Sequence, residues 1–343
     1  MRRFTESVRG GKSLTYGEMR EATNAMFSEE TAGVDIANFL NALSIKGETT
    51  EEIAALVEVL RENATQLPVT SPLVFDNCGT GGDGSQSFNI STTSSFVLAG
   101  AGLKIAKHGN RSISSRTGSA DVLEELGIAL DFLPHEVEEL LNQTNIAFLF
   151  APHVHPKMKR IQSIRKSIGK PTIFNMIGPL TNPVELTSQM VGVYRPDKLM
   201  DIASALHRLG RKSAIVLSGA GGMDEASLAG DNHLVLMKDG DCIPFTLNAQ
   251  EVGLPYASLE AIRGGDAKEN TAILTSVLRG EASPYLDTVL LNAGIGLFGA
   301  GTVSTIQEGV HKARKTISNG RALSVMKSVI AYSQNRNHLE VNA

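Results

Sequence analysis

Residues 76–92, DNCGTGGDGSQSFNIST, follow the apolar run at 73–75 and precede a segment with helical patterning. Four glycines fall within the six residues 79–84, a density that is unusual outside flexible linkers. A strand that passes through a glycine turn into a helix fits this order, because Asn89 and Ser91 are typical of a helix N-terminus. Backbone N–H groups left accessible by glycine, together with a helix N-terminus, form an anion site, most often for phosphate. The stretch therefore predicts an α/β fold with a phosphate site beyond the end of a strand.

The composition is that of an ordinary globular protein. The chain has 343 residues, of which 42% are hydrophobic, enough for one large domain or a large and a small one. The net charge is −4, and the 32 lysines and arginines are not gathered into long blocks. General nucleic-acid binders are usually basic. We therefore expect small-molecule partners and no nucleic acid.

The two cysteines, Cys78 and Cys242, exclude a disulfide framework and a cysteine-based metal site. Cys78 adjoins the glycine turn, where a nucleophile is conceivable, but a small residue at the end of a strand is the favoured interpretation. The N-terminal segment is too polar for a signal peptide, and the apolar run 288–303 is too short and too interrupted by glycine for a membrane span. We expect a cytoplasmic protein with no membrane partner.

Helical patterning dominates the first part of the chain. A capping signal at Thr15 and Glu18, an apolar stripe over 36–43 and a helix beginning near Thr50 predict a small all-helical domain over residues 1–66. Pro68 and Pro72 then mark a change of pattern.

Residues 67–343 alternate short apolar runs with glycine-rich turns and amphipathic helices, which predicts a larger α/β domain with a mainly parallel central sheet flanked by helices. In such sheets ligands bind beyond the carboxyl ends of the strands. The proline-containing segment 166–186 is expected to return to the helical domain. The expected strands are 73–75, 103–106, 147–150, 214–217, 233–237 and 289–291, and the expected helices include 94–100, 119–126, 199–209 and 270–278.

A second polar loop, KHGNRSISSRTGSAD at residues 107–121, follows the strand predicted to end at Ala106. Its cations and small hydroxyl side chains suit a second phosphate group. Alone, the loop is equally compatible with a solvated basic turn capped by Ser119. Two anion-binding loops at successive strand ends favour one ligand with several phosphates.

A third loop, GGMDEAS at residues 221–227, places Asp224 beside Glu225. Adjacent carboxylates repel each other unless they are solvated or share a cation, and hard oxygen ligands suit Mg²⁺, which commonly accompanies phosphates. The alternative interpretation is a helix whose first turn carries acidic residues that complement the helix dipole.

A fourth stretch, FAPHVHPKMKRIQSIR at residues 150–165, suggests an apolar passage that ends at a cation. Arg165 has the geometry to bind a carboxylate through two hydrogen bonds. A single histidine or arginine in such a segment usually has a structural role. The residues expected along the passage are Ala151, Pro152, His155 and Met158.

The chain resembles the anthranilate phosphoribosyltransferases of tryptophan biosynthesis through several long motifs in the same order. The resemblance runs nearly from end to end. The motifs are GTGGD (79–83), FNIST (88–92), KHGNRS (107–112), GSADVLE (118–124), FNMIGPLTNP (174–183), GMDEAS (222–227), GGDAKEN (264–270) and LNAG (291–294).

The resemblance implies a homodimer with a fold like that of the nucleoside phosphorylases. The implied activity is that of a pentosyltransferase, which moves the phosphoribosyl group of 5-phosphoribosyl 1-diphosphate to the amine of anthranilate and releases diphosphate. Two Mg²⁺ ions per subunit are expected, held by Ser91 on one side and by Asp224 and Glu225 on the other. The implied anthranilate ligands are Gly79, Asn110 and Arg165, reached along the apolar passage.

The resemblance assigns two of the loops to the phosphoribosyl donor. The implied residues are Gly79, Gly82, Asp83, Ser87, Asn89, Ile90, Ser91, Thr92, Lys107, His108, Gly109, Asn110, Arg111, Ser112, Ile113, Ser114, Ser115 and Ser119. Two positions depart from the family pattern: Ser87 replaces a common threonine and keeps its hydroxyl, and Val154 replaces a second histidine. We therefore expect His155 to be the functional histidine of that pair.

The sequence is also compatible with three other functions. A pyrimidine nucleoside phosphorylase has the same fold, but the complete set of GTGGD, FNIST and acidic motifs disfavours it. A nucleic-acid-binding paralogue without transferase activity is disfavoured by the intact phosphate loops and the negative net charge. Transfer to a different aromatic amine is the third.

The amine of anthranilate is a neutral nucleophile, so we assign no covalent nucleophile and no general base.

Overall fold

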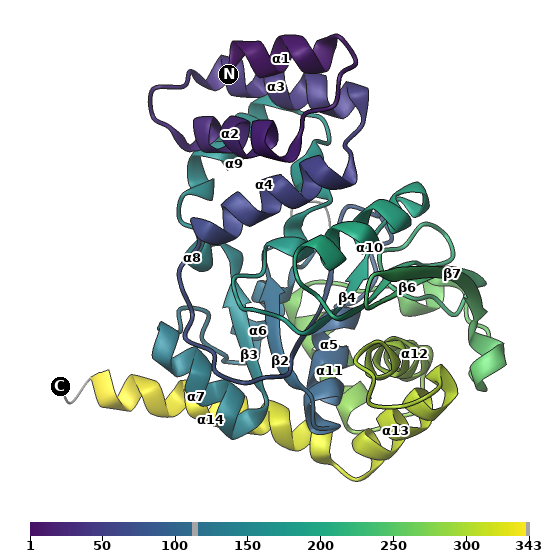
Figure 1. Ribbon diagram of the computed structural model, residues 1–343. Helices are drawn as coiled ribbons and strands as arrows, with labels where there is room; N and C mark the ends of the chain where they lie inside the picture. Colours follow the sequence, from purple (N-terminus) through teal and green to yellow (C-terminus); the bar gives the residue numbers. More distant parts are fainter. Residues whose placement is uncertain (112–115, 341–343) are drawn as a thin grey trace.

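The computed structural model describes residues 1–111 and 116–340 of the chain. A helical bundle built from the N-terminal residues sits above a larger α/β part, and the long C-terminal helix runs along the opposite side of the molecule (Figure 1). The expected fold class, a small helical domain with a larger α/β domain, is confirmed.

The N-terminal bundle contains one helix more than its pattern indicated, since residues 2–9 are helical. Capping boxes at Thr15 and Thr49 begin the second and fourth helices, so the fourth is capped one residue before the predicted Thr50. The apolar stripe over 36–43 is buried as predicted. The helices are α1 Arg2–Arg9, α2 Tyr16–Phe27, α3 Gly33–Lys46 and α4 Thr50–Glu62.

A later segment of the chain packs with this bundle. Helix α9 (Met158–Ile168) lies against α3, and the short 3₁₀ helices η1 (Ile173–Asn175) and η2 (Gly178–Thr181) contact α3 and α4. Ile173, Phe174, Ile177 and Leu180 share one hydrophobic core with the bundle. The domain boundary at residue 66 and the return of residues 166–186 stay predictions, which this packing supports.

The sheet has seven strands in the order β3-β2-β1-β4-β5-β6-β7. Strands β1 to β5 pair in parallel, whereas β6 and β7 form an antiparallel extension at one edge. The prediction of a mainly parallel sheet is therefore confirmed. The strands are β1 Val74–Gly79, β2 Lys104–Gly109, β3 Ile146–Phe150, β4 Ser188–Gly192, β5 Ser213–Ser218, β6 Asp231–Lys238 and β7 Asp241–Asn248.

Three differences from the expected elements have clear causes. The predicted strand 289–291 is wrong, because these residues lie inside helix α12 (Pro284–Gly299), which is buried nearly all round. A short apolar run alone does not distinguish a buried helix from a strand. Strand β4 was missed because it is short and contains the polar Gln189, and β7 because it is a mostly exposed edge strand with Pro244 inside it.

Alternate residues of the central strands point into two separate cores. Ile215 and Leu217 pack with the layer that contains α5 and α12, whereas Ala214 and Val216 pack with α10 and the helical bundle. Both faces of the sheet are therefore covered by helices. The remaining helices are α5 Ile90–Gly100, α6 Ser119–Glu125, α7 Pro134–Thr144, α8 Ala151–Val154, η3 Pro196–Lys198, α10 Leu199–Arg208, η4 Ala249–Val252, η5 Leu259–Ile262, α11 Ala267–Leu278, α12 Pro284–Gly299, α13 Ile306–Ser318 and α14 Arg321–Glu340.

A search for membrane-spanning helices over residues 1–111 and 116–340 finds none with the necessary length and apolar character.

Two buried asparagines hold the loop that follows β5. Asn292 of α12 accepts a hydrogen bond from the backbone N–H of Ala226 and donates one to the carbonyl of the same residue, both at 2.9 Å. Asn232 accepts from the N–H of Ser227 at 2.7 Å and donates to its carbonyl at 3.0 Å. The backbone immediately after Asp224 and Glu225 is therefore anchored on two sides.

Replacing Asn292 by Leu keeps the side-chain volume but leaves two buried backbone groups of Ala226 without partners. Because each such group costs about 1–3 kcal/mol, we expect the free energy of unfolding to fall by about 3 kcal/mol. Urea denaturation measures this change. The exposed helix position Ser324, replaced by Ala, is the control and should change stability by less than about 0.5 kcal/mol. Equal stability of the two variants would contradict the anchoring role.

Candidate active site

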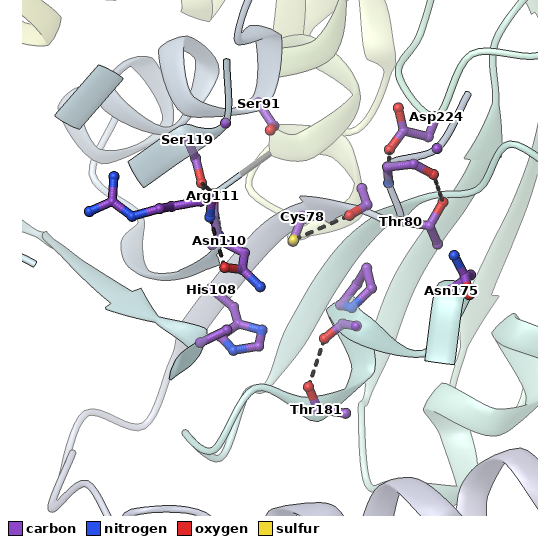
Figure 2. A pocket seen from close by; sticks show the side chains of 18 of the residues that line it. Cys78, Thr80, Ser91, His108, Asn110, Arg111, Ser119, Asn175, Thr181 and Asp224 are labelled. Atoms are coloured by element: carbon purple, nitrogen blue, oxygen red, sulfur yellow. Dashed lines mark hydrogen bonds between the residues drawn. The ribbon is translucent and has the colours of Figure 1, made fainter. Parts of the chain in front are cut away.

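One large cavity, of about 950 Å³, opens beyond the carboxyl ends of β1, β2 and β3. The α/β part contributes the glycine turn, the loop after β2 and the acidic loop after β5, while Leu60, Met158 and Arg165 come from helices α4 and α9. Figure 2 shows labelled residues of the α/β part around this space, among them Thr80 of the glycine turn, Asn110 of the loop after β2 and Asp224 of the acidic loop. The cavity therefore lies where the helical bundle meets the sheet.

The glycine turn leads from β1 into α5 with the geometry that its sequence predicts. Gly81, Gly82 and Gly84 have positive φ angles of 68°, 81° and 71°, a region that other residues rarely adopt. Helix α5 then begins at Ile90, and Asn89 occupies the N-cap position. The helix N-terminus and the glycine backbone face the same cavity.

The acidic loop crosses directly over the ends of two strands. Gly79 of β1 and Gly192 of β4 are paired in register, and a Cβ atom at either position would overlap Asp224. Gly81 donates its N–H to Asp224 Oδ2 at 2.6 Å, and Ser91 donates its N–H to Glu225 Oε1 at 3.1 Å. Residues 219–230 form turns and bends, so the alternative of acidic residues in a first helical turn is wrong.

Three carboxyl groups gather beside the glycine turn. Burial and the neighbouring charge of Asp83 raise the pKa of Asp224, and burial with the charge of Asp224 raises that of Glu225. Oxygen ligands that repel one another in this way favour a divalent cation. Within the described part of the chain no group of three or more His, Cys, Asp or Glu has the arrangement of a complete metal site. The carboxylates of Asp83, Asp224 and Glu225 thus form an incomplete oxygen site. Such a site fits Mg²⁺, which is usually held by one or two carboxylates together with substrate phosphates and water.

A buried cation lies beneath the turn. Lys107 of β2 is 2% exposed and donates from Nζ to the carbonyl of Asn77 at 3.0 Å. Burial raises the pKa of the nearby Asp76 to about 6, an effect that Lys107 and a hydrogen bond from Asn182 oppose. Burial also raises the pKa of the Cys78 thiol to about 12, so the thiol is protonated and the structural interpretation of Cys78 is supported.

Two buried histidines form another wall. The rings of His108 and His155 meet edge to face with centroids 5.3 Å apart, and they hydrogen-bond the backbones of Gly178 and Thr181 respectively. The Nε2 atom of each is buried and has no hydrogen-bond partner among residues 1–111 and 116–340. Burial lowers the pKa of His108 to about 3, with further lowering from His155, and burial lowers that of His155 to about 4. Both imidazoles are therefore neutral at physiological pH.

Arg165 is a cation without a neutralising partner among the described acidic residues. Its guanidinium lies over the ring of Phe174 at 5.3 Å, and Nη2 donates to Asn175 Oδ1 at 3.4 Å. Burial lowers its pKa, but arginine stays protonated in proteins. A desolvated guanidinium on the cavity wall is well suited to bind a carboxylate.

Arg111, in contrast to Arg165, has acidic partners that balance its charge. It forms ion pairs with Asp121 at 2.8 Å and Glu124 at 2.6 Å, and its side chain is half exposed. In Figure 2 it extends away from the other labelled residues. Its charge is thus already balanced, although the residue contributes to the cavity wall.

The cavity brings together every predicted site residue that the structure describes. Ser112, Ile113, Ser114 and Ser115 lie outside the described residues. The lining includes Gly79, Gly82, Asp83, Ser87, Asn89, Ile90, Ser91, Thr92, Lys107, His108, Gly109, Asn110, Arg111, Ser119, Ala151, Pro152, His155, Met158, Arg165, Asp224 and Glu225.

The sequence interpretation gave no role to a further group of lining residues. Six of them belong to one motif, FNMIGPLTNP at residues 174–183. That run of glycine and prolines between buried apolar residues was the available signal. The additional residues include Leu60, Thr117, Gln162, Phe174, Asn175, Ile177, Gly178, Pro179 and Thr181.

Comparisons with known proteins agree with this geometry. Residues 71–323 match the α/β domain of a glycosyl transferase family, and residues 2–64 match its helical bundle domain. The chain is 59% identical to the anthranilate phosphoribosyltransferase of Exiguobacterium sibiricum over 92% of this chain and 93% of that relative. The chain belongs to the anthranilate phosphoribosyltransferases. The resemblance drawn from the motifs is thereby confirmed.

Solved structures of this family superpose over nearly the whole chain. The Thermus thermophilus enzyme has a TM-score of 0.91 at 39% identity, covering 96% of this chain and 99% of that one. The Saccharomyces cerevisiae enzyme in complex with PRPP and Mg has a TM-score of 0.88 at 26% identity, covering 97% of each chain. The same yeast enzyme in complex with 4-fluoroanthranilate gives a TM-score of 0.86 at 26% identity, with the same coverage.

The imidazoles of His108 and His155 should stay neutral from pH 8 to pH 5. In the unfolded chain both histidines take up a proton as the pH falls below about 6.5, whereas in the folded chain their pKa values of about 3 and about 4 keep them neutral. The free energy of unfolding therefore falls as the pH is lowered below about 6.5. Nitrogen-15 NMR of the imidazoles follows the titration, and the urea-unfolded chain is the control. Titration of either ring near pH 6.5 in the folded protein would contradict the expectation.

Proposed function

We propose that the chain transfers the phosphoribosyl group of 5-phosphoribosyl 1-diphosphate to the amine of anthranilate. The products are N-(5-phosphoribosyl)anthranilate and diphosphate, and the reaction is the second step of the tryptophan branch. One observation carries the proposal: a single cavity has anion-binding backbone and carboxylates on one wall and the unneutralised Arg165 on another. The first wall suits a magnesium diphosphate and the second an aromatic carboxylate.

The phosphoribosyl donor is proposed to lie along the glycine turn and the loop after β2. Its diphosphate would accept hydrogen bonds from the backbone of residues 79–92, and Lys107 would supply a positive charge from beneath. The proposed ligands are Gly79, Gly82, Asp83, Ser87, Asn89, Ile90, Ser91, Thr92, Lys107, His108, Gly109, Asn110, Arg111 and Ser119 together with residues 112–115.

Mg²⁺ is the proposed metal, with two ions per subunit. Ser91 would hold one, and Asp224 with Glu225 the other, with Asp83 beside them. Burial and, after it, mutual repulsion raise the pKa values of Asp224 and Glu225, and a bound cation would offset both effects, which supports this assignment. When bound, Mg²⁺ neutralises the negative charge of the diphosphate as it leaves.

Anthranilate is proposed to bind between the two histidines and helix α9. Arg165 would take its carboxylate, while Gly79 and Asn110 approach its amine side, and entry would follow Ala151, Pro152, His155 and Met158. The Nε2 atoms of His108 and His155, which bond no described residue, have lone pairs that make this wall able to accept hydrogen bonds.

The proposed reaction needs positioning and charge stabilisation more than proton transfer. The amine nitrogen forms a bond to C1 of the ribose as the bond from C1 to diphosphate breaks. The amine is already neutral, so no base is needed to activate it, and the cationic nitrogen formed by the attack then releases one proton to the departing diphosphate or to water. Lys107 and the backbone N–H groups stabilise charge that grows on the leaving group, where one well-placed donor contributes roughly 3 kcal/mol. Arg165 holds the acceptor in line for attack.

A homodimer in the cytoplasm completes the proposal. The helical bundle is the proposed dimer surface, because α3 carries two well-exposed apolar side chains, Val34 at 66% and Ile45 at 87% exposure. Contiguous exposed apolar surface marks protein–protein interaction sites.

Loss of anthranilate fluorescence after addition of 5-phosphoribosyl 1-diphosphate and Mg²⁺ tests the proposal directly. We expect turnover with both additions and less than one hundredth of it when Mg²⁺ is removed by chelation, since the donor then lacks its counterion (on the order of 3 kcal/mol or more). Thymidine with phosphate and a salt-dependent gel shift with DNA test the two alternative functions. Cleavage of thymidine without loss of anthranilate would replace the proposal.

Replacing Arg165 by Ala should raise the KM for anthranilate by roughly 10- to 100-fold, because a charge-assisted hydrogen bond to the carboxylate is lost. The KM for the phosphoribosyl donor should stay within about twofold. Lys166→Ala, at the next and exposed position of α9, is the matched control. Steady-state kinetics with each substrate varied in turn measure both constants. Equal increases in both would contradict the role of Arg165.

A further inference from the structure

The motif GGDAKEN at residues 264–270 touches the site from outside the cavity. Asp266 caps helix α11, and Glu269 completes its capping box, so these two polar residues have a local role. Asn270 does not belong to the cap and is only 2% exposed. It lies on the side of α11 that faces α5, two helices that lie close together (Figure 1).

Asn270 closes a ring of four hydrogen bonds with the two phosphate loops. Its Oδ1 accepts from Gly265 N–H at 2.8 Å, and its Nδ2 donates to Asn89 Oδ1 at 2.9 Å. Asn89 Nδ2 donates to the carbonyl of Thr117 at 3.3 Å. Thr117 Oγ1 donates to the carbonyl of Gly265 at 2.8 Å and completes the ring. The side-chain amide of Asn89 is thus engaged at both its oxygen and its nitrogen.

The backbone of the motif also lies against the end of the glycine turn. Phe88 donates its N–H to the carbonyl of Ile262 at 3.2 Å, and Gly264 donates to that of Gln86 at 2.9 Å. A Cβ atom on Gly264 would come within 2.8 Å of Phe88 Cα, so this approach requires glycine. The ring is therefore held in place by main-chain contacts that do not depend on Asn270.

This ring explains an unusual feature of helix α5. Asparagine at an N-cap normally accepts a hydrogen bond from the N–H of the second or third helical residue. Asn89 is the N-cap residue of α5, but its side chain makes no such bond. Its oxygen accepts from Asn270 instead, so Asn89 does not occupy the N–H groups of the first turn.

We propose that Asn270 is a positioning residue that keeps the N-terminus of α5 open for the diphosphate by holding the side chain of Asn89 away from it. Without the Nδ2 donor of Asn270, the oxygen of Asn89 turns towards the N–H of Thr92 and caps its own helix, since the N–H of Ser91 already donates to Glu225. The anion then competes with an internal hydrogen bond. This inference rests on the proposed function, which places the diphosphate at this helix end.

Asn270→Ala should raise the KM for 5-phosphoribosyl 1-diphosphate about tenfold, the usual effect of one lost hydrogen bond, and leave that for anthranilate within about twofold. Asn270→Asp keeps the acceptor for Gly265 N–H, replaces the donor by a second acceptor and adds a negative charge beside Asn89 Oδ1, so it should raise the donor KM at least as much, with the fold retained by circular dichroism. The matched control is Thr271→Val on the same helix. It removes a buried hydroxyl that bonds none of the described residues, and it should match the wild type.

A double-mutant cycle separates positioning from general damage to the structure. Once Asn89 is replaced by Ala no side chain remains to cap α5, so adding Asn270→Ala should change the donor KM by less than about twofold. Additive effects, or equal increases in both KM values, would overturn the proposal.

A calorimetric measurement of magnesium diphosphate binding tests the role of Asn270 separately from the transferase activity. If the wild type binds diphosphate without converting anthranilate, the proposed function fails, while about tenfold weaker binding by Asn270→Ala still supports the role of Asn270. Equal binding by wild type and variant, or no binding by the wild type, overturns the inference.

Discussion

The close contact between Asp224 and the ends of β1 and β4 is the constraint on which the rest of the site depends. Gly79 and Gly192 stand side by side in the sheet, and neither has room for a Cβ atom beneath the acidic loop. Because these two glycines have no side chains, the acidic loop lies close enough for Gly81 N–H to bond Asp224 and for Ser91 N–H to bond Glu225. The glycine turn, the acidic loop and the helix N-terminus therefore form one rigid unit.

The opposite walls of the cavity differ in charge and in origin. Carboxylates and backbone donors belong to the α/β part, whereas Arg165 belongs to a helix that packs with the N-terminal bundle. The neutral histidines lie between them and are oriented by carbonyl groups of η2. Such a division lets one wall bind a highly charged donor while the other selects an aromatic acid by its shape and single negative charge.

Sequence patterns predicted the parts of the site that are continuous along the chain. The glycine turn and the loop at 107–111 carry their chemistry in adjacent residues, so local propensity is enough to place them. Gly192 and Asn270 gave no comparable signal, because their importance comes from contacts with Asp224 and Asn89 far away in the sequence. The sequence is compatible with two interpretations of the acidic loop for the same reason: Asn292 and Asn232, outside residues 221–227, hold its backbone.

The ring through Asn89, Thr117 and Asn270 also bears on the order of folding. It joins residues 181 positions apart, and contacts of such large sequence separation form late because a long loop must first be closed. During synthesis the N-terminal bundle and the first strands emerge well before α11 does. A nascent chain thus contains both phosphate loops before the element that joins them, so the hydrogen bond from Asn270 to Asn89 can form only after α11 has been synthesised.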